Sequence, residues 1–270
     1  MLNAPSAQCS LSICVLASGS KGNAIYVSDG HCAILVDAGL SGIQIEQRMR
    51  AAGLDIRTLK AIVVSHEHSD HIRGVGVLSR RYDLPVYISR ETATAATAQL
   101  GAIQRTQYFT TGQPFAIDHL TVHPFALSHD AADPAGFTIA RDGHKIGIAT
   151  DLGIATGMVR QHLKSCALLV LEANHDPTML IEGPYPWPLK QRIKSRAGHL
   201  SNHDTCALLD ELKHAGLAHV ILAHLSATNN TPEMALETVA ATMKKKDRFK
   251  LHVAHQEHCT DLMVISGLPK

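Results

Sequence analysis

Four side chains that can bind metal ions are crowded into six residues of this chain, at His66, His68, Asp70 and His71. They form the pattern H-x-H-x-D-H and come directly after the apolar run 61–64, which predicts a buried strand. Neutral imidazole and carboxylate are the ligands that zinc, manganese and iron take in proteins. Four polar side chains at a strand end serve no packing purpose and are costly to bury without partners. The cluster therefore predicts a metal site.

The crowding of this cluster favours two neighbouring ions over one. One turn cannot direct four ligands at a single tetrahedral ion and also keep a position open for substrate. Residues farther along the chain must then complete each ligand shell, and His129, Asp151 and His224 also lie just past apolar runs. Strand ends that share one sheet edge are where ligands gather. We therefore expect two divalent ions, which could be zinc, manganese or iron.

The composition of the chain limits its function class. The 270 residues include 18 His but only 5 Phe, 5 Tyr and 1 Trp, so histidine is unusually abundant in this chain. The formal charge of +1 argues against a general nucleic-acid coat protein, although a local basic groove remains compatible with it. The hydrophobic fraction of 45% excludes wholesale disorder. No apolar run approaches the roughly 20 residues that span a bilayer, so we expect no membrane partner.

The cysteines and the first residues bear on the compartment. None of the cysteines forms a C-x-x-C pair, and several lie in apolar runs. Reduced, partly buried thiols are therefore expected instead of a disulfide frame or a zinc ribbon. The first ten residues also lack the charged region of a secretory signal, so we expect a cytoplasmic protein. The cysteines are Cys9, Cys14, Cys32, Cys166, Cys206 and Cys259.

Two strand-rich sections, each followed by helices, must position these residues. Strands are predicted at 13–17, 24–27, 33–36, 61–64, 86–88, 120–127, 136–140, 145–149, 168–171, 219–223, 250–253 and 262–265. Helices are predicted at 41–52, 91–100, 156–163, 188–196, 202–215 and 232–245, with another from the cluster to Tyr82. This α/β pattern predicts two sheets packed face to face with helices outside, and a single doubly wound sheet is the alternative. Because no linker or repeat divides the chain, residues 1–270 are expected to form one domain.

The order and context of the candidate ligands resemble the metallo-β-lactamase superfamily. The resemblance runs from Asp37 to His224 and rests on H-x-H-x-D-H after an apolar strand, with the later ligands in order. It implies an αββα sandwich of two mixed β-sheets flanked by helices, with the site at one edge of both sheets. It also implies the ligand roles: His66, His68 and His129 for the first ion, Asp70, His71 and His224 for the second, Asp151 bridging them, and Asp37 supporting the metal loop from behind.

Three further segments favour phosphate chemistry. The first is the small-residue turn 18–23, whose backbone N–H groups and Lys21 could hold an anion together with Ser20, although such hairpins are also common without one. The second is the run 190–196, with four cations and no acid. On one helix, like charges four residues apart cost a few tenths of a kcal/mol unless an anion is near, although a solvated face is the usual explanation.

The third segment is 198–202, which directly follows the cations. His199 could protonate the leaving oxygen of a phosphodiester or donate a hydrogen bond to it. Ser201 and Asn202 could bind phosphate oxygens, or they could cap the helix that follows. Both roles can coexist, because a helix N-terminus attracts phosphate. Glu172 could orient His199, contact phosphate or pair with another neighbour. For Asp70 we expect a second task besides metal binding, which is to position the nucleophile.

The segments 16–23, 171–176 and 198–202 resemble the YycJ/WalJ-type branch of the superfamily. This resemblance implies a nuclease, with 5′→3′ exonuclease action on DNA preferred over RNA. Lactamases of the commonest type place a cysteine where this chain has Asp151, and glyoxalase II-type thioesterases need an additional helical domain. A small-molecule phosphodiesterase, a thioesterase, or a regulatory partner without enzymatic activity remain the alternatives.

Overall fold

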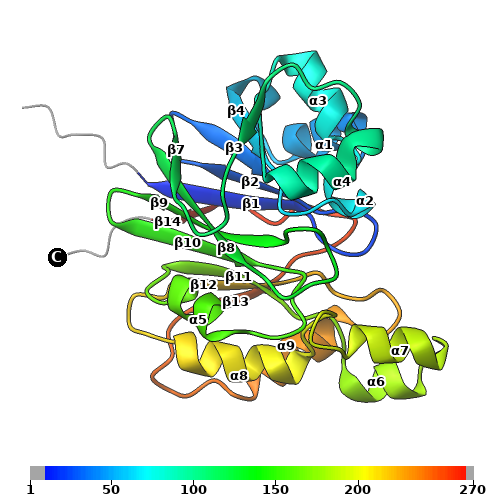
Figure 1. Ribbon diagram of the computed structural model, residues 1–270. Helices are drawn as coiled ribbons and strands as arrows, with labels where there is room; N and C mark the ends of the chain where they lie inside the picture. The colour runs from blue at the N-terminus through cyan, green and yellow to red at the C-terminus, as the bar shows by residue number, and fades with distance from the viewer. Residues whose placement is uncertain (1–9, 266–270) are drawn as a thin grey trace, which may run out of the picture.

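The computed structural model describes residues 10–265 of the chain. Two seven-stranded sheets pack face to face, and helices cover their outer faces (Figure 1). Both sheets combine parallel and antiparallel strand pairs. This is the predicted αββα sandwich of two mixed sheets, so the alternative of a single doubly wound sheet is wrong.

The first sheet has the strand order β14-β1-β2-β3-β4-β5-β6. Its strands are β1 (Leu11–Ala17), β2 (Ala24–Ser28), β3 (Ala33–Val36), β4 (Leu59–Val63), β5 (Val86–Ile88), β6 (Thr106–Tyr108) and β14 (Met263–Ile265). Strands β3 to β6 run parallel, and β14 pairs antiparallel with β1. The helices of this half are α1 (Gly42–Ala51), the short 3-10 helix η1 (Ile56–Thr58), α2 (Ser69–Ile72), α3 (Val75–Tyr82) and α4 (Arg90–Leu100).

The second sheet has the strand order β13-β12-β11-β10-β9-β8-β7. Its strands are β7 (Phe115–Ile117), β8 (Leu120–Ala126), β9 (Ala135–Arg141), β10 (His144–Ala149), β11 (Leu168–Glu172), β12 (His219–Ala223) and β13 (Lys250–Val253). Strands β10 to β13 are parallel, so their carboxyl ends share one edge. The helices of this half are α5 (Gly157–Leu163), α6 (Pro177–Glu182), α7 (Trp187–Ile193), α8 (Asn202–Leu212) and α9 (Pro232–Ala240).

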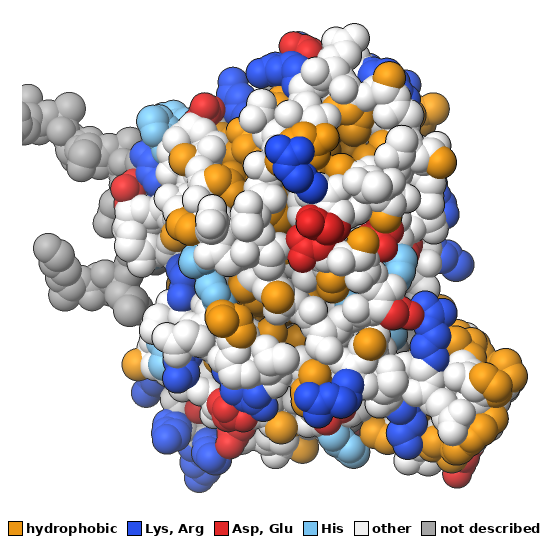
Figure 2. Space-filling model, viewed as in Figure 1, with side chains coloured by type: hydrophobic (Ala, Val, Ile, Leu, Met, Phe, Trp, Pro, Cys, Tyr) orange, Lys and Arg blue, Asp and Glu red, His pale blue; other side chains and the backbone are white. Residues whose placement is uncertain are grey.

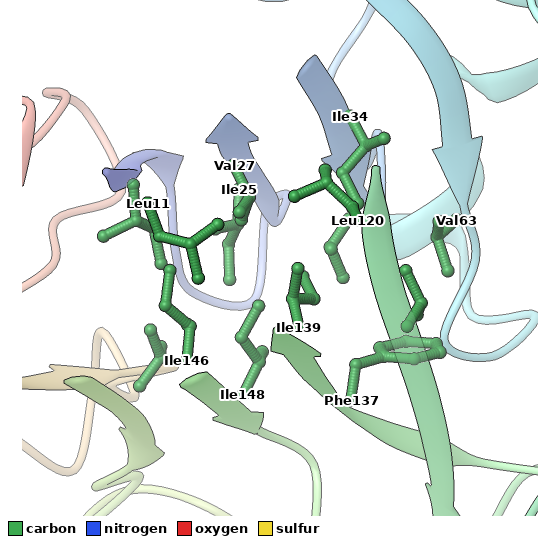
Figure 3. Close-up of a cluster of buried hydrophobic side chains, with 14 of the residues drawn as sticks. Leu11, Ile25, Val27, Ile34, Val63, Leu120, Phe137, Ile139, Ile146 and Ile148 are labelled. Atoms are coloured by element: carbon green, nitrogen blue, oxygen red, sulfur yellow. The ribbon is translucent and has the colours of Figure 1, made fainter. Parts of the chain in front are cut away.

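The main core fills the space between the sheets. Ile34 and Val63 of the first sheet face Ile139 and Ile148 of the second, and all four side chains are buried (Figure 3). Helices cover the outer faces of both sheets, which buries the second face of the strands as well. Strands that are buried on both faces have nearly continuous apolar sequences. This is why the apolar runs located most strands.

Several element boundaries differ from the sequence prediction. The helix expected from the cluster to Tyr82 is two helices, because the Gly74 N–H donates to the Ala38 carbonyl and the Asp70 carbonyl accepts from the Asn23 N–H, both at 2.7 Å, instead of bonding to each other. The helices expected at 188–196, 202–215 and 232–245 end earlier. Helix α6 and the three-residue strands β6 and β7 were not predicted.

Two predictions about the compartment can be compared with the described residues. No helix within residues 10–265 is long and apolar enough to cross a membrane. The described cysteines are all unpaired and mostly buried, as the sequence predicted, while Cys9 lies outside the described residues. Burial raises the pKa of the Cys14, Cys32 and Cys166 thiols to about 12, which keeps them protonated and unreactive.

Candidate metal centre

Three ring nitrogens converge at the edge of the sandwich. The Nδ1 atom of His68 lies 3.2 Å from Nε2 of His66 and 3.4 Å from Nε2 of His129. His66 and His68 belong to the loop between β4 and α2, whereas His129 follows β8 of the other sheet. Three imidazole nitrogens that face one another are the donor set that a tetrahedral divalent ion takes. These residues are the predicted ligands of the first ion.

The predicted ligands of the second ion form a neighbouring group. The Oδ2 atom of Asp70 lies 3.5 Å from Nε2 of His71 and 3.7 Å from Nε2 of His224. Asp151 lies between the two groups, with Oδ2 3.3 Å from His71 Nε2 and Oδ1 3.9 Å from His129 Nε2. The structure therefore brings all the predicted ligands together and places Asp151 in contact with both groups.

Buried atoms without partners show that this cluster fits a cation. Asp151 is 2% exposed and His224 4% exposed, yet neither Oδ2 of Asp151 nor Nε2 of His224 has a hydrogen-bond partner. Buried polar atoms without partners are rare, because each costs about 1–3 kcal/mol. A divalent ion between the carboxylate and imidazole groups would satisfy both atoms. The donor set and its geometry thus match the metals expected from the sequence.

Asp37 holds the metal loop from behind, in the position that the resemblance implies. Its Oδ2 atom accepts hydrogen bonds from Nδ1 of His71 and Oγ of Ser65, both at 2.7 Å, and its Oδ1 atom accepts from the Ser65 N–H. A carboxylate on one ring nitrogen fixes the ring so that the other nitrogen faces the metal. Burial lowers the pKa of His71, but the charges of Asp151 and Asp37 outweigh burial and raise it well above its usual value.

Glu172 connects two histidines at the end of β11. Its side chain is fully buried, and its Oε1 atom lies 2.8 Å from Nδ1 of His199 and 2.8 Å from Nδ1 of His224. Burial raises the pKa of Glu172, but the neighbouring His199 and His224 lower it by more. The carboxyl group is therefore ionised and accepts hydrogen bonds. Both Nδ1 atoms therefore donate, and both rings turn Nε2 away from the glutamate. Of the open roles for Glu172, orienting His199 is the one that this geometry supports.

Glu172 was only weakly indicated by the sequence. It follows an apolar strand directly, as the candidate ligands do, but its partners His199 and His224 lie 27 and 52 residues away along the chain. Its second oxygen accepts hydrogen bonds from the N–H groups of Leu152 and Leu200. The full set of partners explains why a carboxylate is retained at a buried position.

His199 reaches the site through a sharp turn after α7. The chain folds back over residues 194–198, where the His199 N–H donates to the Ile193 carbonyl at 2.9 Å. Gly198 is required there, because a Cβ would lie 2.2 Å from the same carbonyl oxygen. His199 is one of the residues that line a cleft of about 290 Å³ over the metal-ligand cluster. Burial lowers the pKa of His199, but Glu172 outweighs burial and raises it.

The same turn corrects the prediction for the basic run. Helix α7 ends at Ile193, so Arg196 does not lie on the same helix as Arg192 and cannot form the expected like-charge pair. Lys190 is buried, and its Nζ atom donates to the carbonyls of Ile181 and Gly183. The cations therefore have different roles, and only Arg192 among them lines the cleft.

Ser201 and Asn202 have structural partners within the chain. The Ser201 hydroxyl donates to the Asp204 carboxylate and accepts from the Asp204 N–H, which forms a capping box at the start of α8. Asn202 is fully buried and exchanges amide hydrogen bonds with Asn230. Both side chains anchor α8, which supports the helix-capping interpretation, and neither of them lines the cleft. Phosphate binding by Ser201 and Asn202 stays a prediction.

The turn 18–23 supports the site mainly through its buried residues. The Ser18 hydroxyl accepts a hydrogen bond from the His224 N–H at 2.7 Å, and Asn23 contacts the Asp70 carboxylate at 3.2 Å. Ser20 lines the cleft, as a phosphate-binding residue must. Lys21 does not line it, and its backbone N–H donates to Gln256. The predicted anion-binding role stays a prediction for both residues, and of the two only Ser20 lines the cleft.

Comparisons with known proteins agree with this geometry. Residues 33–225 match the family model described as the beta-lactamase superfamily domain. The chain is 39% identical to exodeoxyribonuclease YycJ of Bacillus anthracis, over 92% of this chain and 94% of the relative. It is 35% identical to exodeoxyribonuclease WalJ of Streptococcus pneumoniae, over 93% of this chain and 97% of the relative.

A solved structure supports the fold independently of close sequence similarity. The metallo-β-lactamase fold protein YhfI of Bacillus subtilis superposes with a TM-score of 0.71 at 16% identity, over 93% of this chain and 99% of that one. At this identity the likeness concerns the fold alone. The family match, the two near-full-length relatives and the αββα sandwich together show that this chain belongs to the metallo-β-lactamase superfamily, in its YycJ/WalJ-type branch.

Proposed function

We propose that this chain is a metal-dependent nuclease that binds two divalent ions and degrades DNA from the 5′ end. The observation that supports it best is the convergence of the predicted ligand groups beside His199 in one cleft. The names of the two near-full-length relatives, both exodeoxyribonucleases, support DNA as the substrate. The preference for DNA over RNA and the 5′→3′ direction belong to the proposal.

The proposed mechanism assigns separate tasks to the residues of the cleft. The ligand cluster would hold two divalent ions, which would supply hydroxide near neutral pH and offset the charge of the phosphate. Asp70 positions the nucleophile, since its carboxylate lies at the cleft surface beside His71 and His224. Glu172 holds Nδ1 of His199, and Nε2 of His199 donates a proton to the leaving oxygen.

The metal-ligand assignment is tested by His68→Ala. This variant is expected to lose hydrolysis of bis(p-nitrophenyl) phosphate by at least about a hundredfold, because the first ion loses one of its three imidazoles. Circular dichroism should remain native, since His68 lies in a loop. Unchanged activity would contradict the assignment.

His31→Ala is the matched control for this variant. His31 is an exposed histidine in the turn between β2 and β3, and β3 runs parallel to β4. The turn before β3 therefore lies at the edge of the sheet opposite the cluster that follows β4. Full activity is expected for His31→Ala, so a loss in both variants would mean that the effect is not specific to the site.

The direction of degradation is tested with end-labelled oligonucleotides. With metal-loaded protein, a 5′ label is expected to appear first in mononucleotides, while a 3′ label stays on progressively shorter fragments. The same oligonucleotide made of RNA is expected to be degraded more slowly. Early release of the 3′ label would contradict 5′→3′ exonuclease action. The appearance of 5′-labelled fragments of intermediate length at the first time points would contradict it as well.

The alternatives from the sequence are separated by the choice of substrate. A small-molecule phosphodiesterase is expected to prefer cyclic nucleotides over DNA, and a thioesterase to cleave glutathione thioesters. A regulatory partner is expected to bind metal and hydrolyse none of these compounds. Each of these results would replace the proposed nuclease function.

A further inference from the structure

One side of the cleft is lined by aromatic, apolar and cationic side chains instead of candidate metal ligands. Tyr185, Leu189, Arg192 and Ile193 line the cleft from α7 and the loop before it. Trp187, two residues after Tyr185, begins α7 and is 57% exposed. We call these five residues the α7 wall. Figure 2 shows hydrophobic side chains gathered over α6 and α7 at the lower right, beside Lys and Arg side chains.

We propose that the α7 wall binds unpaired bases of the DNA strand, with Trp187 as a stacking surface outside the cleft. The proposal rests on the proposed nuclease function and specifies its substrate as single-stranded DNA or a frayed end. Aromatic side chains beside cations are the combination that binds single strands, because rings stack on bases and cations contact phosphates. Paired bases inside a duplex do not offer their faces to such a wall.

The hydrogen bonds that hold this segment do not involve the Trp187 indole. The two helices are joined by Lys190, whose buried Nζ atom donates to the carbonyls of Ile181 and Gly183 at 2.6 and 2.7 Å. The Asp176 side chain caps α6, and its N–H donates to the Asn229 carbonyl. These polar contacts fix the hairpin of α6 and α7 without the indole ring. A rigid, exposed aromatic side chain loses little conformational entropy when it binds.

The charges around the α7 wall favour a polyanion. Arg192 is held at the rim of the cleft by Asp130, with its Nε atom 2.6 Å from Oδ2. Asp130 in turn follows His129 of the candidate metal cluster, which fixes the guanidinium relative to the site. Lys194 and Arg196 are exposed just after α7. A strand that leaves the cleft along this wall meets aromatic rings and cations together, which matches bases and phosphates better than an apolar protein partner.

Fluorescence of the metal-loaded protein tests the stacking directly. Trp187 is the only tryptophan of the chain, so its emission reports on this position alone. A phosphorothioate oligothymidylate of about ten nucleotides, which resists cleavage, is expected to quench the emission through base stacking. An abasic oligonucleotide of the same length carries the same phosphates and is expected to leave the emission unchanged. Equal quenching by both, or by neither, would overturn the proposal.

Kinetics provide a second test that separates this proposal from the nuclease function. For Trp187→Ala, kcat/KM on single-stranded DNA relative to bis(p-nitrophenyl) phosphate is expected to fall about tenfold, mainly through KM. Trp187→Phe is expected to restore most of it, because phenylalanine also stacks. Val264→Ala, which removes an exposed apolar side chain of β14 outside the cleft lining, is the matched control and should not change the ratio.

Each outcome of the kinetic test has a definite meaning. An unchanged ratio for Trp187→Ala, in a wild-type protein that degrades single-stranded DNA, would overturn the α7 wall and leave the nuclease function intact. Equal rates on single-stranded and blunt duplex DNA would overturn the preference for unpaired strands and would also leave the nuclease function intact. Hydrolysis of bis(p-nitrophenyl) phosphate without any cleavage of DNA would overturn the nuclease function itself. Association of the wild-type protein with another protein through Trp187, without base-dependent quenching, would also overturn the proposal.

Discussion

The carboxylate of Glu172 serves two histidines that have different tasks in the proposed reaction. One oxygen accepts hydrogen bonds from His224, a candidate metal ligand, and from His199, the candidate proton donor. Burial lowers the pKa of His224, but Asp151, Asp70 and Glu172 outweigh burial and raise it to about 10. Metal affinity and proton donation therefore depend on the same buried side chain.

Glu172→Gln is expected to impair both tasks. A glutamine amide cannot accept all the hydrogen bonds that the two carboxylate oxygens accept, so at least one histidine loses its orientation. Metal affinity is expected to fall by about 10- to 100-fold, and kcat by about a hundredfold.

Metal titration separates the two effects of Glu172→Gln. Excess metal is expected to restore occupancy, measured by elemental analysis, but not kcat, because the orientation of His199 is still lost. Glu237→Gln, on the exposed side of α9, is the matched control and should behave as wild type. Full recovery of kcat with excess metal would contradict the role assigned to His199.

At the residue scale, the sequence located the candidate ligands, and the family resemblance added Asp37, but the role of Glu172 stayed open. The ligands are recognisable because each is a polar residue directly after an apolar strand. The sequence left two roles open for Ser201 and Asn202, because a helix N-cap and a phosphate site use the same residue types; the contact with Asp204 and the burial of Asn202 support the capping role. Glu172 remained ambiguous because its partners are distant in sequence.

Three strand ends of the site have an unusual backbone conformation. Asp37, Asp151 and His224 follow β3, β10 and β12 with φ angles of 60°, 62° and 55°. Residues other than glycine adopt this left-handed region uncommonly, at a cost of order 1 kcal/mol each. The hydrogen bonds and packing around these ends must offset that cost, so the elements that hold them tolerate little change.

Gly39→Ala is expected to disturb the site through such an element. A Cβ at Gly39 would lie 1.6 Å from the Asp70 carbonyl oxygen and 2.6 Å from the Asn23 nitrogen. The loop after β3 must therefore move away from α2, which carries Asp70 and His71. We expect a loss of about 2 kcal/mol in the free energy of unfolding, measured by urea denaturation, together with weaker metal binding. Gly157→Ala, where no atom lies within 4 Å, should be close to neutral; equal losses in both would contradict the steric explanation.

Asp29 joins the two sheets at another position. It follows β2 of the first sheet, and its Oδ2 atom lies 2.6 Å from NH1 of Arg141 in β9 of the second. Asp29→Ala is expected to lower the free energy of unfolding by about 1–2 kcal/mol at neutral pH, because the N–H groups of His31 and Cys32 lose their acceptor, while Arg141 keeps the Asp142 carboxylate at 2.8 Å. Asp29→Asn should lose less, since its carbonyl oxygen can still accept from the N–H groups of His31 and Cys32.

The pH dependence of this effect has a definite sign. Burial raises the pKa of Asp29, but the hydrogen bonds from Cys32, His31 and Arg141 outweigh burial and lower it below its usual value. The stabilisation is therefore complete above the ordinary carboxyl range and is lost as the pH falls through the folded-state pKa. The difference between wild type and Asp29→Ala should shrink when urea denaturation is repeated near pH 3, and a growing difference would contradict this linkage.

At the element scale, apolar runs were sufficient for most strands but not for short elements. Helix α6 has six residues between several prolines, too few for a helical apolar pattern. The end of α7 depends on the contact of Gly198 with the Ile193 carbonyl, which only the folded backbone shows. The sequence therefore indicated which elements exist more reliably than where they end.

Across the whole molecule, the candidate metal centre lies at the edge of the sandwich, where strand ends of both sheets meet. His66 to His71 follow the first sheet, whereas His129, Asp151 and His224 follow the second. Bound ions would therefore connect the two halves of the sandwich. Two strand-rich sections predicted this arrangement in outline, and the family resemblance was needed to exclude a single sheet.

Metal removal is expected to lower the stability of the whole fold. A ligand that binds only the folded state stabilises it by about 2.7 kcal/mol at a hundredfold excess over its Kd. For a chain of this size, that corresponds to a rise in Tm of about 5 °C or more. Differential scanning calorimetry with zinc or manganese, and after chelation, measures the difference. A smaller shift is expected for His68→Ala, and an unchanged Tm despite stoichiometric binding would contradict an ion that connects the two sheets.

The order of the strands also affects when a newly made chain can become active. The first four candidate ligands have been synthesised by residue 71, but His224 is added much later, and β14 must still return to pair with β1. A ribosome-bound chain therefore carries an incomplete ligand set for most of its synthesis. Under the proposed function, a chain terminated before His224 lacks part of the candidate ligand set and is expected not to degrade DNA.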